Sequence, residues 1–221
     1  MNILAIECTH AALSVAVKKA GIVFELKSAD WRKAAEALVP LIEEVMSQST
    51  LKMQELDCVA VSSGPGSFTS LRIGMSVAKG IAYGLGVPLV PVPTMPAMAS
   101  SLQARAGSVM AVIQARKGEY YYAAYISGDL SSGIWHDEVL RGSAMAVAAA
   151  VEAGCVVVGR QLDELLPFLA ARGVASADAD FFSARTLFSA AERLYSTADA
   201  ATLDRVVPDY RQTFIPNVGK A

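Results

Sequence analysis

The stretch CVAVSSGPGSFT, residues 58–69, joins an apolar run to a Gly-Pro-Gly turn and the start of a helical pattern. The run over residues 58–61 predicts a short buried strand, and residues 68–83 predict a helix directly after the turn. A buried strand that leads through a glycine turn into a helix is typical of an α/β protein.

Upstream of this stretch, the hydrophobic pattern predicts three consecutive strands, over residues 3–8, 12–18 and 22–27. A helix follows, in which the apolar residues recur every three or four positions: Ala34, Leu38, Leu41, Ile42 and Val45. Because proline has no N–H, Pro40 favours a start of the regular helix near Ala37. The order of elements in the first half is therefore βββαβα.

The second half repeats that order. Strands are predicted over residues 109–115, 119–126, 134–140 and 156–158, and helices over residues 143–153, 162–172 and 181–195. Two βββαβα units in tandem indicate a duplicated ribonuclease-H-like fold, the two-lobed actin-like (ASKHA) architecture. We place the lobes at residues 1–103 and 104–221, with the join in the polar, small-residue-rich segment 100–108.

Composition narrows the class of protein. The chain has 221 residues, 53% of them hydrophobic, with a formal net charge of −2. This excludes a disordered chain, and it disfavours tight nucleic-acid binding by this chain alone. The three cysteines have no CxxC spacing and are predicted to be small core residues in a reducing compartment. No segment has the pattern of a signal peptide or a membrane span, so we expect a cytoplasmic protein.

The glycine loop allows two interpretations. Its backbone N–H groups could approach an anion at the helix N-terminus, which makes Gly64, Gly66, Ser67, Thr69 and Arg72 candidate cofactor-binding residues. Equally, the loop could be a tight turn with Ser67 or Thr69 as the helix cap. Arg72, unfavourable in a first helical turn, is expected to have a carboxylate or phosphate partner.

No catalytic residue, metal site or cofactor is predicted. The two histidines, His10 and His136, lack neighbours at a ligand spacing, since adjacent residues in the predicted strand around His136 point to opposite faces. Glu7 ends the first strand, where an acid could orient water or Mg²⁺, but Gln114 stands at the equivalent end of the second lobe. The missing second acid weighs against ATP hydrolysis.

An interaction surface is expected on two helices of the first lobe. The helix over residues 68–83 carries the small row Gly74, Ala78 and Ala82, which could admit either the chain's own sheet or a partner. Since this helix is apolar nearly all round, we expect it to join the preceding helix in an interface. The expected interface residues are Leu38, Leu41, Ile42, Val45, Ile73, Gly74, Val77, Ala78 and Ile81.

Residues 63–74, SGPGSFTSLRIG, with Ala78-Lys79-Gly80 after them, closely resemble the signature of the bacterial TsaB (YeaZ) family. Further matches lie in the same order, at residues 2–6 (NILAI), 115–121 (ARKGEYY) and 208–211 (PDYR). The resemblance spans essentially the whole chain.

This resemblance implies a non-catalytic scaffold and activator of the TsaD transferase, which makes threonylcarbamoyladenosine next to the tRNA anticodon. It further implies a TsaE-type ATPase partner, a homodimer when the chain is alone, indirect contact with tRNA, and no activity alone although the subunit is essential to the complex. The sequence departs from the family pattern at Glu7-Cys8, at Ala34-Ala35 and at Gln114. Two alternatives stay open, a small-molecule kinase of the same superfamily and a glycoprotease-like hydrolase.

Overall fold

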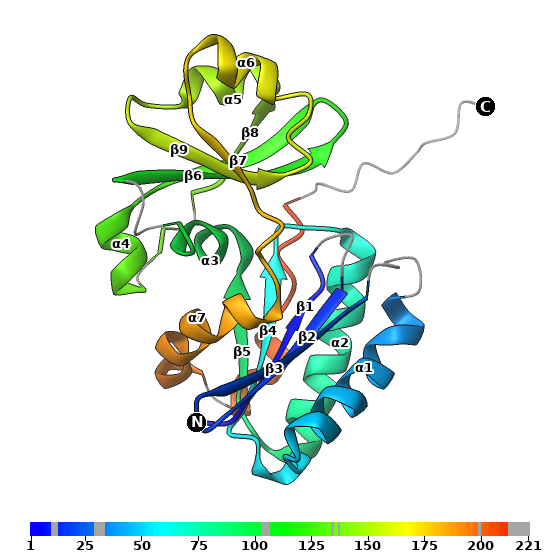
Figure 1. Ribbon diagram of the computed structural model, residues 1–221. Coiled ribbons are helices and arrows are strands. Elements are labelled where there is room, and N and C mark those ends of the chain that lie inside the picture. The colour runs from blue at the N-terminus through cyan, green and yellow to red at the C-terminus, as the bar shows by residue number, and fades with distance from the viewer. Residues whose placement is uncertain are drawn as a thin grey trace, which may run out of the picture.

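A computed structural model describes residues 1–9, 13–28, 34–102, 107–133, 135–136, 138–198 and 200–211. The chain forms two lobes, each built on a five-stranded sheet (Figure 1). His10 lies outside the described residues, and so do the last ten residues of the chain.

The first sheet has the order β3-β2-β1-β4-β5, with β1 antiparallel to β2 and parallel to β4. Its strands are β1 (Ile3–Glu7), β2 (Leu13–Lys19), β3 (Ile22–Ser28), β4 (Cys58–Gly64) and β5 (Leu89–Pro93). The strand β1 is buried on both faces, and its residues Ile3–Ile6 have no exposed surface. Helices therefore cover both sides of this sheet.

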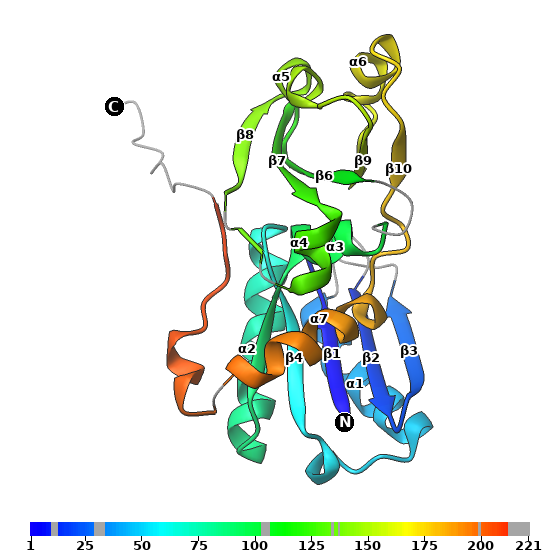
Figure 2. The same cartoon turned by 90° about the vertical axis from the view of Figure 1, so that its left-hand side faces the viewer.

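One face of the first sheet carries α1 (Ala34–Ser49) and α2 (Phe68–Leu85), with the short 3-10 turn η2 (Met53–Glu55) between α1 and β4. Leu4 and Ile6 point into this layer and pack with Leu38, Val45 and Ala78. The opposite face carries α7 (Leu187–Leu194), which follows the turn η4 (Ala184–Thr186) and packs on β1, β4 and β5 (Figure 2).

The second sheet has the order β10-β9-β6-β7-β8. Its strands are β6 (Ser108–Arg116), β7 (Glu119–Ile126), β8 (Leu140–Ser143), β9 (Cys155–Arg160) and β10 (Ser176–Asp178). Here β6 pairs antiparallel with β7 and parallel with β9, the arrangement that β1 has with β2 and β4. The repeated topology confirms the duplicated, two-lobed α/β fold.

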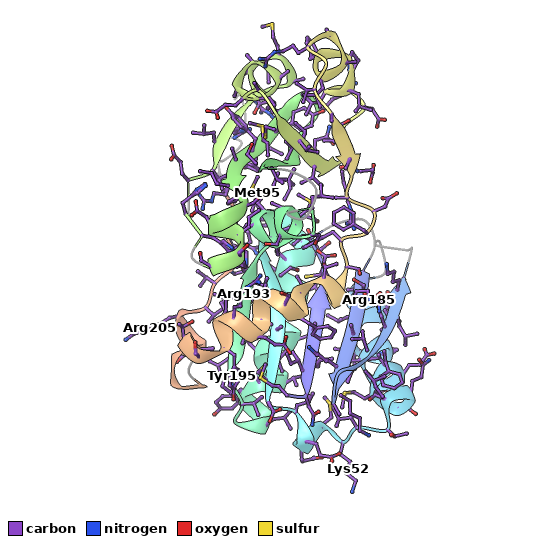
Figure 3. All side chains as sticks on the ribbon, turned by 60° about the vertical axis from the view of Figure 1, so that its left-hand side comes forward. Lys52, Met95, Arg185, Arg193, Tyr195 and Arg205 are labelled. Atoms are coloured by element: carbon purple, nitrogen blue, oxygen red, sulfur yellow. The ribbon has the colours of Figure 1, made fainter. Side chains whose placement is uncertain are left out.

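Four short helices accompany the second sheet: α3 (Thr94–Ser100), α4 (Ser127–Ser132), α5 (Ala144–Ala150) and α6 (Leu166–Ala171). Helix α3 lies where the lobes meet, with Met95 fully buried there (Figure 3). The chain then returns to the first lobe through α7, the turns η5 (Tyr195–Thr197) and η6 (Ala200–Arg205), and an extended segment to Arg211.

Several predicted boundaries are wrong for identifiable reasons. Helix α1 begins at Ala34 rather than near Ala37 and contains Pro40. Pro40 is exposed, so water can satisfy the carbonyl that its missing N–H leaves free. The predicted strand over residues 134–140 is also wrong, since β8 begins only at Leu140 and α4 precedes it.

The pattern missed three further elements. The strand β5 and the helix α3 have prolines at positions 91, 93 and 96, which reduce the strand and helix signals alike. Strand β10 is three residues long and reads Ser-Ala-Asp, too short for a periodicity to show.

Candidate functional site

The glycine loop between β4 and α2 is held by backbone contacts with the rest of the chain. The Gly64 N–H donates to the Thr94 hydroxyl at 3.2 Å, and the Ser67 N–H donates to the Thr9 carbonyl at 2.9 Å. The Leu71 N–H donates to the Ser67 carbonyl at 2.9 Å, and this hydrogen bond begins helix α2. Two of the amides that an anion could have used therefore have partners within the protein.

The glycines themselves are required by close backbone approach. Gly64 has φ +112°, and a Cβ there would overlap the backbone carbonyl of Asp209. A Cβ on Gly66 would lie 2.6 Å from the Thr9 Cβ. These contacts fit the tight-turn interpretation of the loop. Ser67 occupies the cap position, but its hydroxyl accepts from the Ser70 hydroxyl at 3.1 Å and makes no cap hydrogen bond.

Arg72 has a partner of a different kind from the one expected. Its guanidinium carbon lies 3.8 Å from the centroid of the Phe68 ring and 5.3 Å from that of Tyr210. Its Nε donates to the Tyr210 hydroxyl at 3.1 Å. Among the described residues, the partners of Arg72 are thus these two rings and the Tyr210 hydroxyl rather than a carboxylate. Tyr210 is not among the site residues predicted from the sequence, although the PDYR match at residues 208–211 contains it.

Glu7 is a fully buried carboxyl at the end of β1. Its Oε1 accepts from the N–H of Thr9 at 2.8 Å and from the Thr9 hydroxyl. Its Oε2 has no hydrogen-bond partner among the described residues. Burial raises the pKa of Glu7, and the Thr9 hydrogen bonds and the charges of Arg160 and Lys27 oppose that rise. Next to it, burial raises the pKa of the Cys8 thiol to about 12.

The described residues contain no group of three or more His, Cys, Asp or Glu side chains placed to hold a metal ion. His136 Nε2 lies 2.8 Å from the Ala124 carbonyl, and its ring stacks on Tyr125 with centroids 4.8 Å apart. Gln114, in β6, is half-buried and pairs in register with Tyr120 of β7. Within the described helices, none is long and apolar enough to cross a membrane.

The structure divides the expected interface residues into two groups. Five are buried against the chain's own sheet: Leu38, Ile42, Val45, Gly74 and Ala78. A Cβ on Gly74 would overlap the Cys8 sulfur, so the row of Gly74, Ala78 and Ala82 serves close packing inside the lobe. Of the two alternatives left open for this row, the structure shows packing on the chain's own sheet, which corrects the expectation that Gly74 and Ala78 contact a partner. The other four, Leu41, Ile73, Val77 and Ile81, are partly exposed.

A second small row lies on the outer side of α2. Ser76, Gly80 and Gly84 are exposed, and a Cβ on either glycine would meet no atom within 4 Å. Tyr83 beside them is 81% exposed. We call these four residues, with the partly exposed Ile73, Val77 and Ile81, the outer face of α2.

Comparison with known proteins places this architecture in a family. The family model "TsaD: tRNA N6-adenosine threonylcarbamoyltransferase" matches residues 7–152. The chain is 36% identical over 143 residues to the "tRNA threonylcarbamoyladenosine biosynthesis protein TsaB" of Escherichia coli, covering 62% of this chain and 60% of that protein. It is 31% identical to the protein of the same name from Haemophilus influenzae, covering 57% and 54% respectively. The matches therefore span less than two thirds of these curated relatives.

Among solved structures, "YeaZ from Pseudomonas aeruginosa" superposes with a TM-score of 0.76 at 21% identity, covering 95% of this chain and 100% of that one. The fold is thus that of a two-lobed α/β protein of the actin-like class. The chain belongs to the TsaB (YeaZ) family. These findings favour neither the kinase nor the hydrolase alternative.

Proposed function

We propose that this chain is a non-catalytic subunit that binds and activates a TsaD-type transferase in the threonylcarbamoyl modification of tRNA adenosine. Support comes from the family, from the TsaB names of its curated relatives, and from the outer face of α2. The observation that carries the proposal is the pair of exposed glycines on that face, Gly80 and Gly84.

A glycine inside a helix costs about 0.5–1 kcal/mol relative to alanine. At Gly74 this cost has a reason within the chain, because the Cys8 sulfur occupies the space of a Cβ. At Gly80 and Gly84 the space of a Cβ is open. Small residues four positions apart allow a second helix to approach closely, so a helix of another subunit fits this face.

The partly exposed apolar side chains complete the surface. Ile73, Val77 and Ile81 flank the small row on α2, and Leu41 adds a neighbouring apolar side chain from α1. Burying such side chains supplies the binding free energy, and the glycines allow the close approach. The same surface would serve a homodimer when the transferase is absent, so the two assemblies would exclude each other.

The proposed role is structural rather than chemical. The glycine-loop candidates Gly64 and Gly66 contact the chain's own backbone, and Arg72 stacks on Phe68 and Tyr210. The complex would also include a TsaE-type ATPase, and tRNA would be held through the complex. The proposed lobes are residues 1–103 and 104–221. Helix α7 belongs to the second lobe by this division but packs on the sheet of the first.

Co-purification with a TsaD-type subunit tests the proposal. Gly80→Leu should leave a folded chain that loses the transferase in size-exclusion chromatography and no longer supports tRNA modification. Gly128→Leu is the matched control, because Gly128 is also exposed, helical and without an atom within 4 Å of its Cβ position. Unchanged co-elution of Gly80→Leu would contradict the interface, and failure of the wild-type chain to bind or activate the transferase would contradict the function.

A further inference from the structure

Residues 206–211 form an extended segment that reaches both lobes. In the first lobe, the Asp209 N–H donates to the Ser63 carbonyl at 2.7 Å, directly before the glycine loop. In the second lobe, the Tyr121 hydroxyl of β7 donates to the Arg211 carbonyl at 2.9 Å. Figure 2 shows this segment, in red, beside α2 and rising along one edge of the molecule toward the second sheet. We call residues 206–211 the strap.

The strap is anchored to the first turns of α2 by an arginine that packs against two neighbouring aromatic rings. The Phe68 and Tyr210 rings lie 4.8 Å apart between centroids, and Arg72 stacks on both and donates to the Tyr210 hydroxyl. Arginine suits this role because its planar guanidinium can stack and donate at the same time, whereas a lysine ammonium cannot stack. An ion pair between Arg211 Nε and Asp209 Oδ2, at 2.6 Å, fixes the strap's own conformation.

The glycine loop contacts the strap closely at Gly64. Only a residue without a Cβ leaves room at position 64 for the Asp209 carbonyl, and the positive φ of Gly64 turns the chain so that this approach occurs. Two family-like motifs, the glycine loop and PDYR, are thereby explained by one contact between them.

The strap also closes one side of a cavity between the lobes. This cavity has a volume of about 240 Å³ and is lined by residues of the first lobe, the second lobe and the strap, among them Pro65, Met95, Tyr125, Trp135 and Asp209. Figure 3 shows Met95 at this junction. Trp135 is already partly exposed, and movement of the strap would expose it further.

Arg72 lies four residues before Ser76, in line with Gly80 and Gly84, and all four are exposed. The strap anchor is therefore continuous with the outer face of α2. We infer that the strap locks the two lobes in one arrangement, and that the transferase subunit binds the strapped form, contacting Arg72 and Tyr210 beside the outer face. The second part of this inference rests on the proposed function; the first does not.

The lock is tested on the chain alone by hydrogen exchange at the Asp209 amide. Tyr210→Ala and Arg72→Lys should each speed its exchange about tenfold, because each removes stacking, and Tyr210→Ala also removes the hydrogen bond. Tyr210→Phe, which keeps the ring, should have a smaller effect. Arg205→Ala, an exposed arginine just before the strap, is the control and should leave exchange unchanged.

Quenching of tryptophan fluorescence is a second readout of the strap's position. In a Trp31→Phe background, Trp135 is the remaining tryptophan, and acrylamide should quench its fluorescence more strongly in Tyr210→Ala than in Arg205→Ala. Equal exchange and equal quenching in the anchor variants and the control would overturn the lock.

The partner's preference for the strapped form is tested in the complex. Adding the transferase should slow exchange at Asp209, and Tyr210→Ala should weaken binding about tenfold while Arg205→Ala does not. A complex that forms with the same affinity in Tyr210→Ala and leaves the strap amides unprotected would overturn this part while the proposed function stands. If the wild-type chain forms no complex, the proposed function fails and the result on the chain alone still decides the lock.

Discussion

Helix α2 presents two rows of small residues with the same four-residue spacing to two different surroundings. On the inner side, Gly74 and Ala78 face the first sheet, where the Cys8 sulfur fills the space of a Cβ. On the outer side, Gly80 and Gly84 face open space. The comparison shows that small-residue spacing indicates close approach without indicating which side of the helix is approached.

The largest effect is expected from Gly74→Ala. A methyl group there would overlap the Cys8 sulfur, and the helix would have to move away from β1. Overpacking of this kind costs about 1–3 kcal/mol and occasionally more, so we expect a loss at the upper end of that range. Chemical denaturation of the purified variant measures it, and Gly74→Ala with Cys8→Ala should recover part of the loss if the sulfur is the cause.

A comparison of Ala78→Leu with Ser76→Leu tests the inner and outer sides of α2 directly. Ala78 has no exposed surface, so leucine should destabilise the chain by about 1–3 kcal/mol. Ser76 is exposed, and leucine there should change stability by about 0.5 kcal/mol or less. Thermal melts of both variants check this, and similar melting temperatures would contradict the assignment of the two sides.

Glu7 lies next to Cys8 at the end of β1, and its substitution should change how stability depends on pH. Because burial raises the pKa of Glu7 above its ordinary value near 4.5, the folded chain keeps a proton that the unfolded chain releases as pH rises. Wild-type stability should therefore fall as the pH rises from 4.5 toward the raised pKa, with a slope of about 1.4 kcal/mol per pH. Glu7→Gln, which mimics the protonated form, should lack this dependence. Melts from pH 4 to pH 9 that run parallel in both proteins would refute it.

A small effect of the opposite sign is expected from Gly80→Ala on the outer side. Alanine should stabilise the isolated chain by about 0.5–1 kcal/mol, which is about 1–4 °C in melting temperature, since nothing lies within 4 Å of the new Cβ. The same variant should bind the transferase less tightly than wild type if a helix approaches this face. A gain in stability together with undiminished binding would leave the outer glycines without a role in the interface.

The order of elements was predictable because α2 and the strands β1, β2 and β6 are long enough for periodicity to show. The orientation of α2 was not predictable, since its apolar residues surround the helix and only packing against the first sheet decides which side is inner. The partner of Arg72 was hidden for another reason. Tyr210 lies 138 residues away, and no local pattern joins the two. The prolines in β5 and α3 weaken the local sequence signal for a strand and a helix, and tertiary contacts stabilise both elements instead.

The three free cysteines are all buried, and each belongs to a different hydrophobic cluster. Cys8 lies under α1 and α2, Cys58 on the α7 side of the first sheet, and Cys155 beneath α5 and α6. Burial raises the pKa of Cys8 and Cys58 to about 12, which keeps these thiols protonated and unreactive in the folded chain. A thiol reagent would therefore modify each site only when its own layer opens. The three modification rates would rank the layers by how often each one opens, without any introduced label.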